Sequence, residues 1–432
     1  MSNSKAPYVS RRGFLQTTGV LAAAGAWTAS SYARVIGAND RIRIGFIGAG
    51  SMGTAHLRTI AKLKKKNNLE SVAVADVWKE RAEIGAKVVG APLVLTDYHK
   101  VLDIKDIDYV TIATPEHQHV VMALDAMDAG KALYCEKPMT HTIEEAQQVL
   151  QRQKETKLPV QIGVQATSDD SFRSAAEAVK AGKLGRVVQA QIEYVRHYGQ
   201  AGPWRNPAIK DDTSKPDDLD WDAWLGDAPK IEWNPHHYFE WRNYAAYSGG
   251  ICTDLFIHRI TRIMLACDLF YPRRVVGMGG IWQWPDGRDL PDNFEMICEY
   301  PRGMTVYVLG TMSNKTGIDH LIRGTLATLQ FTPTGWTIKD DDGKVLQTHK
   351  KTGAEDTHLH HTNLHNHLRN GEPLHCPVNL GMAAVVAVNM ANESWRTGQM
   401  MGWDAENQRM VPARSLQFNP YPEASPSTLS GT

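Results

Sequence analysis

The sequence has few cysteines and no excess of charge of either sign. Its 432 residues include five cysteines, 47 Lys+Arg and 47 Asp+Glu. Five scattered cysteines with no C-x-x-C pair exclude a disulfide framework and a zinc finger. The balanced charge excludes a nucleic-acid partner. A content of 22% charged residues excludes a disordered chain and a multi-span membrane protein. A globular protein of two or three domains remains.

The first 33 residues also lack acidic side chains. They contain three basic residues, including the pair Arg11-Arg12, then a weakly apolar stretch over 17–28 and small residues before position 34. These are the parts of an export signal, and the arginine pair resembles the twin-arginine (Tat) signal. We therefore expect 1–33 to be a Tat-type signal peptide, with a single membrane anchor as the alternative. The expected location is periplasmic or otherwise exported, with the Tat export machinery as a partner.

A glycine turn follows the first predicted strand. Residues 42–47 form a buried apolar run, and a helical pattern covers 54–64. Between them stands a G-x-G-x-x-G pattern, in which glycines permit a tight turn and close approach of the backbone to a pyrophosphate. The N-terminus of the following helix offers unpaired N–H groups to the phosphates. We predict that these residues bind a dinucleotide: Gly48, Ala49, Gly50, Ser51, Met52 and Gly53.

An acidic residue ends the second predicted strand. Asp76 follows the apolar run 72–75 and is placed to accept hydrogen bonds from the adenosine ribose. Its charge would repel a 2′-phosphate, which favours NAD, although the nearby Lys79 and Arg81 leave NADP possible. The alternative is that Asp76 caps a helix over 79–88.

Strands and helices continue to alternate along the first half of the chain. Further strands are predicted over 108–113, 132–135 and 160–164, with helices between them. This alternation predicts a doubly wound parallel α/β sheet, a Rossmann domain over 40–165. Ligands of such sheets bind beyond the carboxyl ends of the strands. The cofactor-binding candidates there are Thr114, Pro115, His119, Glu136, Lys137 and Gln165.

The second half is rich in predicted strands and contains an aromatic segment. Strands are expected over 187–198, 274–282, 294–300 and 304–311, and a hairpin around 341–343. Residues 194–247 contain five Trp, five Tyr and Phe239. Aromatic faces beside acids and amides suit a sugar or polyol, but a satellite core or a dimer contact would use the same side chains. The substrate-binding candidates within the segment are Trp204, Arg205 and Arg242.

Four ordered motifs together resemble one enzyme family. They are Gly48–Gly53, Asp76, the run Thr114-Pro115-Glu116-His117-Gln118-His119 with Glu136-Lys137-Pro138, and the segment Gly249-Gly250 followed by Asp254 and His258. This order resembles the Gfo/Idh/MocA oxidoreductases over roughly residues 40–410. The resemblance implies a Rossmann domain and a second α/β domain, over 166–415, with a large open, mostly antiparallel sheet. A flexible tail over 416–432 would follow.

The same resemblance implies roles for three catalytic residues. Lys137 would stabilise the reacting substrate oxygen, and His258 would accept the hydroxyl proton. Asp254, one turn earlier, would orient His258 or the substrate, so both would also contact the substrate. The sequence departs from the family at Thr261, where members often have an aspartate. Without the motif order, His258 would read as a core histidine inside an apolar helix.

A run of histidines is the one pattern suggestive of a metal. His358, His360, His361, His365 and His367 lie close together, and two of them are four residues apart on one helical face. No acidic ligand is paired with them and no HExxH motif is present, so we expect a helix without a metal.

The sequence thus predicts an exported NAD(P)-dependent oxidoreductase acting on a sugar, glycoside or polyol. Export implies that the nicotinamide cofactor is loaded before transport and held tightly. One alternative is a redox-neutral NAD-dependent glycosidase or lyase that oxidises its substrate transiently and eliminates the glycosidic oxygen. Another is a non-catalytic binding protein on the same fold. By analogy with the family, a homo-oligomer is expected.

Overall fold

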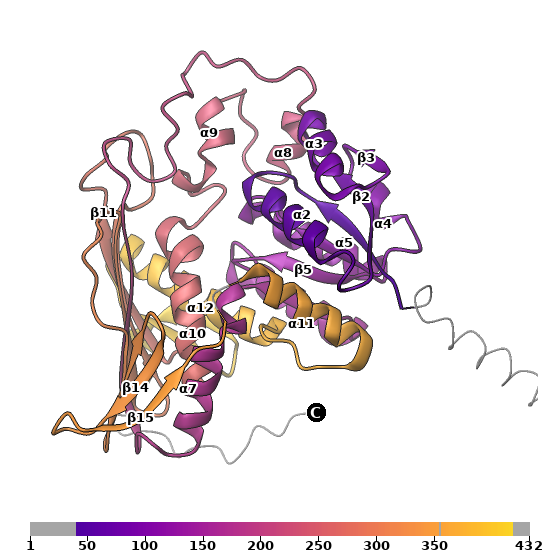
Figure 1. Ribbon diagram of the computed structural model, residues 1–432. Coiled ribbons are helices and arrows are strands. Elements are labelled where there is room, and N and C mark those ends of the chain that lie inside the picture. The colour runs from indigo at the N-terminus through magenta and orange to yellow at the C-terminus, as the bar shows by residue number, and fades with distance from the viewer. Residues whose placement is uncertain (1–39, 354–355, 418–432) are drawn as a thin grey trace, which may run out of the picture.

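The computed structural model describes residues 40–353 and 356–417. The expected signal peptide and all but the first two residues of the expected tail lie outside these ranges. Within them, no helix is long and apolar enough to cross a membrane. The described chain contains two sheets, with helices between them (Figure 1).

The first sheet is the predicted Rossmann sheet. Its six strands are all paired in parallel, in the order β3-β2-β1-β4-β5-β6. The edge strand β3 is three residues long and partly exposed, and its sequence has too short an apolar run to be predicted. The strands are β1 (Ile42–Ile47), β2 (Leu69–Ala75), β3 (Leu93–Leu95), β4 (Tyr109–Ile112), β5 (Ala132–Glu136) and β6 (Val160–Gly163).

Helices connect these strands as a doubly wound sheet requires. The last long one, α6, starts at a capping box in which Thr142 and Glu145 exchange side-chain to backbone hydrogen bonds. The helices are α2 (Ser51–Leu63), α3 (Lys79–Val89), α4 (His99–Leu102), α5 (His119–Asp128) and α6 (Ile143–Thr156), with the 3-10 turns η1 (Glu116–Gln118) and η2 (Gln165–Ser168).

The second sheet is large, open and mostly antiparallel, which confirms the expected fold class. It has eleven strands in the order β15-β14-β13-β12-β7-β10-β9-β8-β16-β17, with β11 beside β7, and its one parallel pair is β7 with β10. The predicted hairpin is formed by β14 and β15. The strands are β7 (Val187–His197), β8 (Arg274–Gly280), β9 (Asn293–Tyr300), β10 (Met304–Thr311), β11 (Ser313–Asn314), β12 (Leu321–Gly324), β13 (Thr328–Thr332), β14 (Gly335–Lys339), β15 (Val345–Lys350), β16 (Met401–Asp404) and β17 (Arg409–Pro412).

Helices cover one face of this sheet and join it to the Rossmann domain. α12 packs on β8 and also on α6, and α10 packs on α7, α12 and β7. Figure 1 shows the sheet edge-on with these helices on the side of the Rossmann domain. α11 contacts α2 and η2. The helices are α7 (Asp170–Lys180), α10 (Ile257–Cys267), α11 (Thr357–Asn370) and α12 (Val378–Thr397), with the π-helix η4 (Ile251–Phe256) before α10 and the 3-10 turn η5 (Ala413–Ser415).

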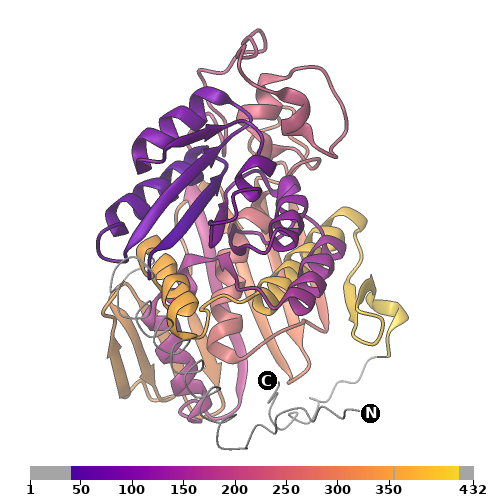
Figure 2. The ribbon, with the colours of Figure 1, turned by 90° about the vertical axis from the view of Figure 1, so that its right-hand side faces the viewer.

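The aromatic segment forms a long insert between β7 and η4, residues 198–250. It contains α8 (Trp221–Leu225), α9 (Pro235–Phe239) and the 3-10 turn η3 (Trp241–Asn243). The insert arches from the second domain to the Rossmann domain (Figures 1 and 2). There it pairs with the chain after β2, where the Asp220 N–H donates to Val77 (2.9 Å) and the Lys79 N–H donates to Asp218 (3.2 Å). The insert is therefore anchored beside Asp76.

Candidate functional site

The glycine turn between β1 and α2 has the shape that a phosphate group requires. Gly48 has a φ of +89°, and a Cβ on Gly53 would lie 2.1 Å from the Gly48 oxygen, so neither position accepts a side chain. A Cβ on Gly50, in contrast, would meet only the Arg81 guanidinium at 3.7 Å. The N-terminus of α2 has no side-chain cap. Its N–H groups and the open Gly50 backbone therefore fit a pyrophosphate.

Asp76 follows β2 and is tied to the glycine turn. Its Oδ2 accepts from the Ala49 N–H (2.7 Å), and its Oδ1 accepts from the Trp78 N–H (2.9 Å). Burial raises the pKa of this carboxyl group above its usual value, although the two N–H donors oppose the shift. Asp76 is thus held at the turn with its carboxylate partly exposed toward the pocket, as contact with a ribose hydroxyl requires.

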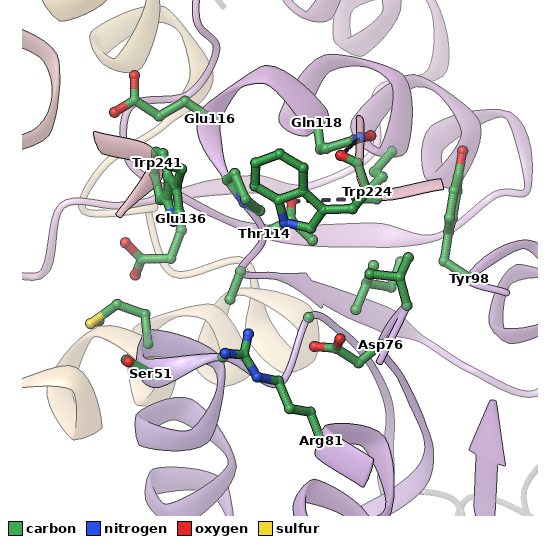
Figure 3. Close-up of a pocket in the computed structure, with 18 of the residues that line it drawn as sticks. Ser51, Asp76, Arg81, Tyr98, Thr114, Glu116, Gln118, Glu136, Trp224 and Trp241 are labelled. Carbon is green, nitrogen blue, oxygen red and sulfur yellow. Dashed lines mark hydrogen bonds between the residues drawn. The ribbon is translucent and has the colours of Figure 1, made fainter. Parts of the chain in front are cut away.

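A pocket of about 1160 Å³, open solvent included, runs between the Rossmann domain and the insert. In Figure 3, Asp76 and Tyr98 lie toward one end, and Glu116, Glu136 and Trp241 lie toward the other. Both domains line it. The Rossmann side includes the glycine turn, Asp76, Arg81, Thr114, Pro115, Glu136 and Lys137, and the insert contributes Ala223, Trp224, Tyr238, Phe239, Trp241 and Arg242.

Lys137 joins the two domains at the end of the pocket away from Asp76. Its ammonium donates to Oδ1 of Asp254 (2.8 Å) and to the backbone oxygen of Asp254 (2.7 Å). Arg242 donates through Nε to the same Oδ1 (2.9 Å) and stacks over Trp241. Although burial disfavours its charge, Asp254 has a pKa well below the usual range because Arg242 and Lys137 surround it. The carboxylate is therefore a fixed anion and not a proton acceptor near neutral pH.

Two family models match the chain in this order. The model described as "Oxidoreductase family, NAD-binding Rossmann fold" matches residues 42–164, and the one described as "Oxidoreductase family, C-terminal alpha/beta domain" matches 168–417. The chain belongs to the Gfo/Idh/MocA oxidoreductase family. The resemblance seen in the sequence motifs is confirmed, and NAD is the cofactor of the Rossmann domain.

Curated relatives align with part of the chain. Inositol 2-dehydrogenase of Salmonella typhimurium is 31% identical over 159 residues, which are 36% of this chain and 46% of the relative. The scyllo-inositol 2-dehydrogenase (NAD(+)) of Bacillus subtilis is 28% identical over 169 residues, 37% of this chain and 49% of the relative. The chain thus spans about half the length of the curated relatives it matches.

Solved structures of the same fold align with most of the chain. Levoglucosan dehydrogenase in complex with NADH and L-sorbose has a TM-score of 0.67 at 19% identity, over 87% of this chain and 100% of that one. The WlbA dehydrogenase from Bordetella pertussis, in complex with NADH and UDP-GlcNAcA, has a TM-score of 0.63 at 16% identity, over 84% and 98%. At this identity the likeness establishes the fold.

Of the remaining residues predicted to bind the cofactor, one lines the pocket and two lie behind its wall. Glu136 lines the pocket, and its Oε1 accepts from Gln165 (2.7 Å) and bonds with His56 (2.8 Å). His119 is buried, with ring nitrogens 2.8 Å from the Pro138 oxygen and 3.0 Å from that of Thr114. Gln165 and His119 therefore hold the wall of the site in place and do not line it.

His258 lies at the start of α10, one turn after Asp254, and is half-buried. Burial lowers its pKa well below the usual value, and the charges of Lys137 and Arg262 add to the shift. The imidazole is therefore unprotonated near pH 7, which is the form that a base needs, although the lowered pKa also makes it a weaker base. It does not line the pocket, so its role as a base stays a prediction.

The structure places Trp204 and Arg205 away from the pocket. Arg205 is paired with Glu240 and Asp286 and donates to the Tyr244 hydroxyl (3.2 Å), so it links two loops of the second domain. Trp204 packs against the main core. Their predicted contact with substrate stays a prediction, whereas Arg242 and Asp254 lie together at the site.

The aromatic insert forms the satellite core that the sequence left open as one interpretation, and its contact with a substrate stays a prediction. Trp221 and Trp224 stack with ring centroids 4.8 Å apart, and Trp233 and Tyr238 pack around them. These side chains belong to a satellite core. Its edge, including Trp224, nevertheless lines the pocket.

The histidine run lies on α11 and is packed against the Rossmann domain. His361 Nε2 is 2.9 Å from His56 Nδ1, and His365 Nε2 is 2.9 Å from the Tyr109 hydroxyl. His360 bonds with Ser168 (2.7 Å). Over the ranges given above, no group of three or more potential ligands is arranged to hold a metal.

Sequence reasoning gave no binding role to several residues that line the pocket, among them Glu116, Arg81 and Trp224. Glu116 stands inside a quoted motif but received no role, although an acid that directly follows a buried parallel strand is a usable signal. Arg81 reaches the pocket with its guanidinium 4.7 Å from the centre of the Trp78 ring and 5.1 Å from that of Tyr238. Trp224 comes from the insert, and nothing in its local sequence distinguishes it from the other tryptophans.

Proposed function

We propose that this chain is an NAD-dependent oxidoreductase that transfers a hydride between a hydroxyl carbon of a sugar, glycoside or polyol and a retained nicotinamide cofactor. The observation that carries the proposal is the Lys137–Asp254–Arg242 cluster at one end of a pocket whose other end has the glycine turn and Asp76. Inositol and levoglucosan dehydrogenases among the relatives and fold neighbours support the substrate class.

Each residue of the site has a separate proposed role at the reacting carbon. NAD supplies the hydride acceptor when it is bound. Two of the three ammonium N–H groups of Lys137 bond to Asp254, which leaves one to stabilise negative charge on the substrate oxygen. Asp254 and Arg242 fix that ammonium in place. We propose that the neutral imidazole of His258 accepts the proton of the substrate hydroxyl.

A substrate panel tests this proposal. The purified protein is incubated with myo-inositol, levoglucosan, free sugars and aryl glycosides, and both the product and the absorbance of NADH are followed. The expected result is an oxidised product from a polyol or sugar with matching reduction of NAD. Absence of any oxidised product across the panel contradicts the proposal.

Retention of the cofactor is supported by the position of the insert. Besides its pairing with the chain after β2, the insert accepts a hydrogen bond at the Trp224 oxygen from Gln118 (2.7 Å). It is thus anchored on both sides of the pocket, next to Asp76 and next to Thr114. We expect denaturation of the purified protein to release about one nicotinamide nucleotide per chain, and an empty purified protein contradicts retention. Emptiness together with failure to bind added NAD would favour a non-catalytic binding protein.

A second candidate function shares the same site. A retained cofactor has to be reoxidised in place, which a redox-neutral glycosidase or lyase achieves by returning the hydride. Aryl glycosides separate the two candidates, because release of the aglycone without net NADH supports the second and a persistent ketone supports the first.

Export through the Tat pathway is part of the proposal and rests on residues 1–33 alone. Replacing Arg11-Arg12 by two lysines should abolish export, as followed by fractionation of cells producing the full chain. Unchanged export of this variant contradicts the assignment.

Self-association is proposed through the face of the second sheet opposite its helices. Met278 and Ile297 point outward there and are 68% and 45% exposed. Both strands, β8 and β9, lie near the middle of the described sheet. Light scattering should give a dimer or larger species, and Met278→Glu with Ile297→Glu should dissociate it. A monomeric wild type contradicts the proposal.

A further inference from the structure

Glu116 connects the Rossmann domain to the glycine pair of the second domain. It lies in η1, directly after β4, and is buried. Its Oε1 accepts from the Ser248 hydroxyl (2.7 Å), and its Oε2 accepts from the Thr253 hydroxyl (2.9 Å) and the Gly249 N–H (3.2 Å). Two of the donors lie just before η4 and the third lies within it, as does Asp254.

The directions of these hydrogen bonds favour the carboxylate over the protonated acid. The Ser248 hydroxyl oxygen accepts from the Gly250 N–H (3.0 Å), and the Thr253 hydroxyl oxygen accepts from the Gly249 N–H (2.9 Å). Each hydroxyl therefore accepts a hydrogen bond from a glycine N–H and donates one to Glu116. A protonated Glu116 would have to donate to one of these oxygens, so that hydroxyl would lose its acceptor.

The glycine pair has little freedom to find another arrangement. A Cβ on Gly249 would lie 2.3 Å from the Thr253 side chain, and Gly250 has a φ of +66°. The π-helix starts immediately after, and its Asp254 bonds to Lys137 of the Rossmann domain. The position of Asp254 relative to Lys137 therefore depends on how the glycine pair is held.

We propose that Glu116 is a positioning residue that, as a carboxylate, holds the glycine pair and thereby sets Asp254 of one domain against Lys137 of the other. This inference rests on the catalytic roles proposed above for Lys137 and Asp254. It gives a function to an acid that forms no direct ion pair with any described residue.

The charges around Glu116 make its protonation sensitive to pH near neutrality. Burial and the nearby anion Asp254 raise its pKa to about 7, while the Ser248 and Thr253 hydroxyls and the ammonium of Lys137 oppose the shift. Arg242 from η3 also faces it. His141 lies against the Ser248 backbone with a pKa lowered by burial, and the buried Cys252 thiol has a raised pKa, so neither adds charge near pH 7.

Activity and stability should respond to this group in opposite directions. The unfolded state ionises Glu116 near pH 4.5, so between that pH and 7 only the folded state holds the proton. The contribution of this group to stability therefore falls as pH rises through this window. The positioned, ionised form accumulates over the same window, so activity rises. A carboxyl group kept only for packing would give the first effect without the second.

The test compares Glu116→Gln, which removes the charge and keeps the shape, with Glu116→Asp, which keeps the charge. We expect Glu116→Gln to lower kcat/KM by about 10- to 100-fold at pH 8 and to remove the decrease of activity below about pH 7. The aspartate variant should keep that decrease. Nucleotide affinity should not change. A glutamine variant with the wild-type pH profile and kcat/KM overturns the proposal.

Hydrogen exchange provides a readout that does not need turnover. At pH 8, peptides covering 248–257 should exchange faster in Glu116→Gln than in the wild type, whereas peptides covering β1 should not. Equal exchange in both proteins overturns the proposal. If no substrate is turned over, the proposed function fails, and this measurement still decides the role of Glu116.

Changes on the opposite side of the contact serve if Glu116→Gln does not fold. Thr253→Val removes one hydroxyl and Thr253→Ser keeps it, so only the valine variant should lose activity and protection. Combined with Glu116→Gln, the valine change should add little, because the two residues act through one interaction. Fully additive effects, or equal loss with serine and valine, overturn the proposal.

Discussion

Two buried polar clusters lie on either side of the segment Glu136-Lys137. The side chains of one are held mainly by ion pairs, and those of the other are held by hydrogen bonds of histidine rings. The charged cluster, Glu116, Lys137, Arg242 and Asp254, sits between the domains and lines the pocket except at Asp254. The histidine cluster, His56, His360, His361 and His365, sits behind β5 and bonds to Tyr109, Ser168 and Glu136. None of the four histidines lines the pocket. The position of a cluster in the fold therefore indicates its function better than its residue types do.

The two clusters also differ in charge. Lys137 and Asp254 form an ion pair with side chains that are 8% and 7% exposed, and Arg242 and Lys137 keep the pKa of Asp254 well below its usual range. Burial lowers the pKa of His360 to about 4 and that of His361 well below its usual value, so these rings are neutral. A fixed charge beside a pocket can stabilise a reacting oxygen, whereas a neutral ring behind a strand contributes packing and hydrogen bonds.

The largest expected effect comes from removing the ammonium of the charged cluster. Lys137→Ala should lower turnover by about 10²–10³-fold, the loss typical of one donor to a reacting oxygen. The fold should persist because Arg242 still pairs with Asp254, and the nucleotide should stay bound. Turnover and bound nucleotide per chain are measured, with the exposed Lys100→Ala as control. Wild-type turnover in the lysine variant would show that the charged cluster is structural, like the histidines.

The comparison also explains how far the sequence could lead. The Rossmann strands other than the short edge strand β3, the glycine turn and Lys137 were predictable because each signal lies within about ten residues of the chain. The mostly antiparallel second sheet and the family were reached only through the order of four motifs. The same order brought Asp254 into the site, where it bonds to Lys137, a contact that the sequence did not predict.

The rest depends on partners far apart in sequence. Arg205 is a substrate-binding candidate in the sequence, whereas in the structure it is paired with Glu240 and Asp286. Glu116 and Thr253 are 137 residues apart, and His56 and His361 are 305 apart. No local pattern records such contacts, so the packing partners of the histidine run and the role of Glu116 stayed unassigned.

An intermediate effect, on stability instead of turnover, is expected from the histidine cluster. His361 stacks on Tyr134 with centroids 4.1 Å apart and bonds to His56. His361→Ala removes both contacts and should lower the free energy of unfolding by about 2–3 kcal/mol, with turnover changed less than tenfold. Urea denaturation measures the first and the substrate assay the second. The partly exposed His358 on the same helix is the control. Loss of turnover at unchanged stability would place this cluster in the site after all.

The smallest expected effect separates the two clusters by pH. Burial lowers the pKa of His365 to about 3, so the unfolded state takes up its proton near pH 6.5 and the folded state does not. Stability is therefore complete above that pH and is lost as pH falls below it, by about 1 kcal/mol per histidine between pH 7.5 and 5.5. Asp254 stays ionised throughout this range and adds no slope.

His365→Gln isolates this term, because an amide can still bond to Tyr109 and Asn67 but does not titrate. The loss of stability between pH 7.5 and 5.5, measured by urea denaturation at each pH, should be about 1 kcal/mol smaller in the variant than in the wild type. Glu116 contributes a slope of opposite sign to both proteins, so it cancels in the difference. The exposed His99→Gln should leave the difference near zero. An unchanged slope in His365→Gln would mean that this ring is protonated in the folded protein, and its contrast with the ionised Asp254 would then be lost.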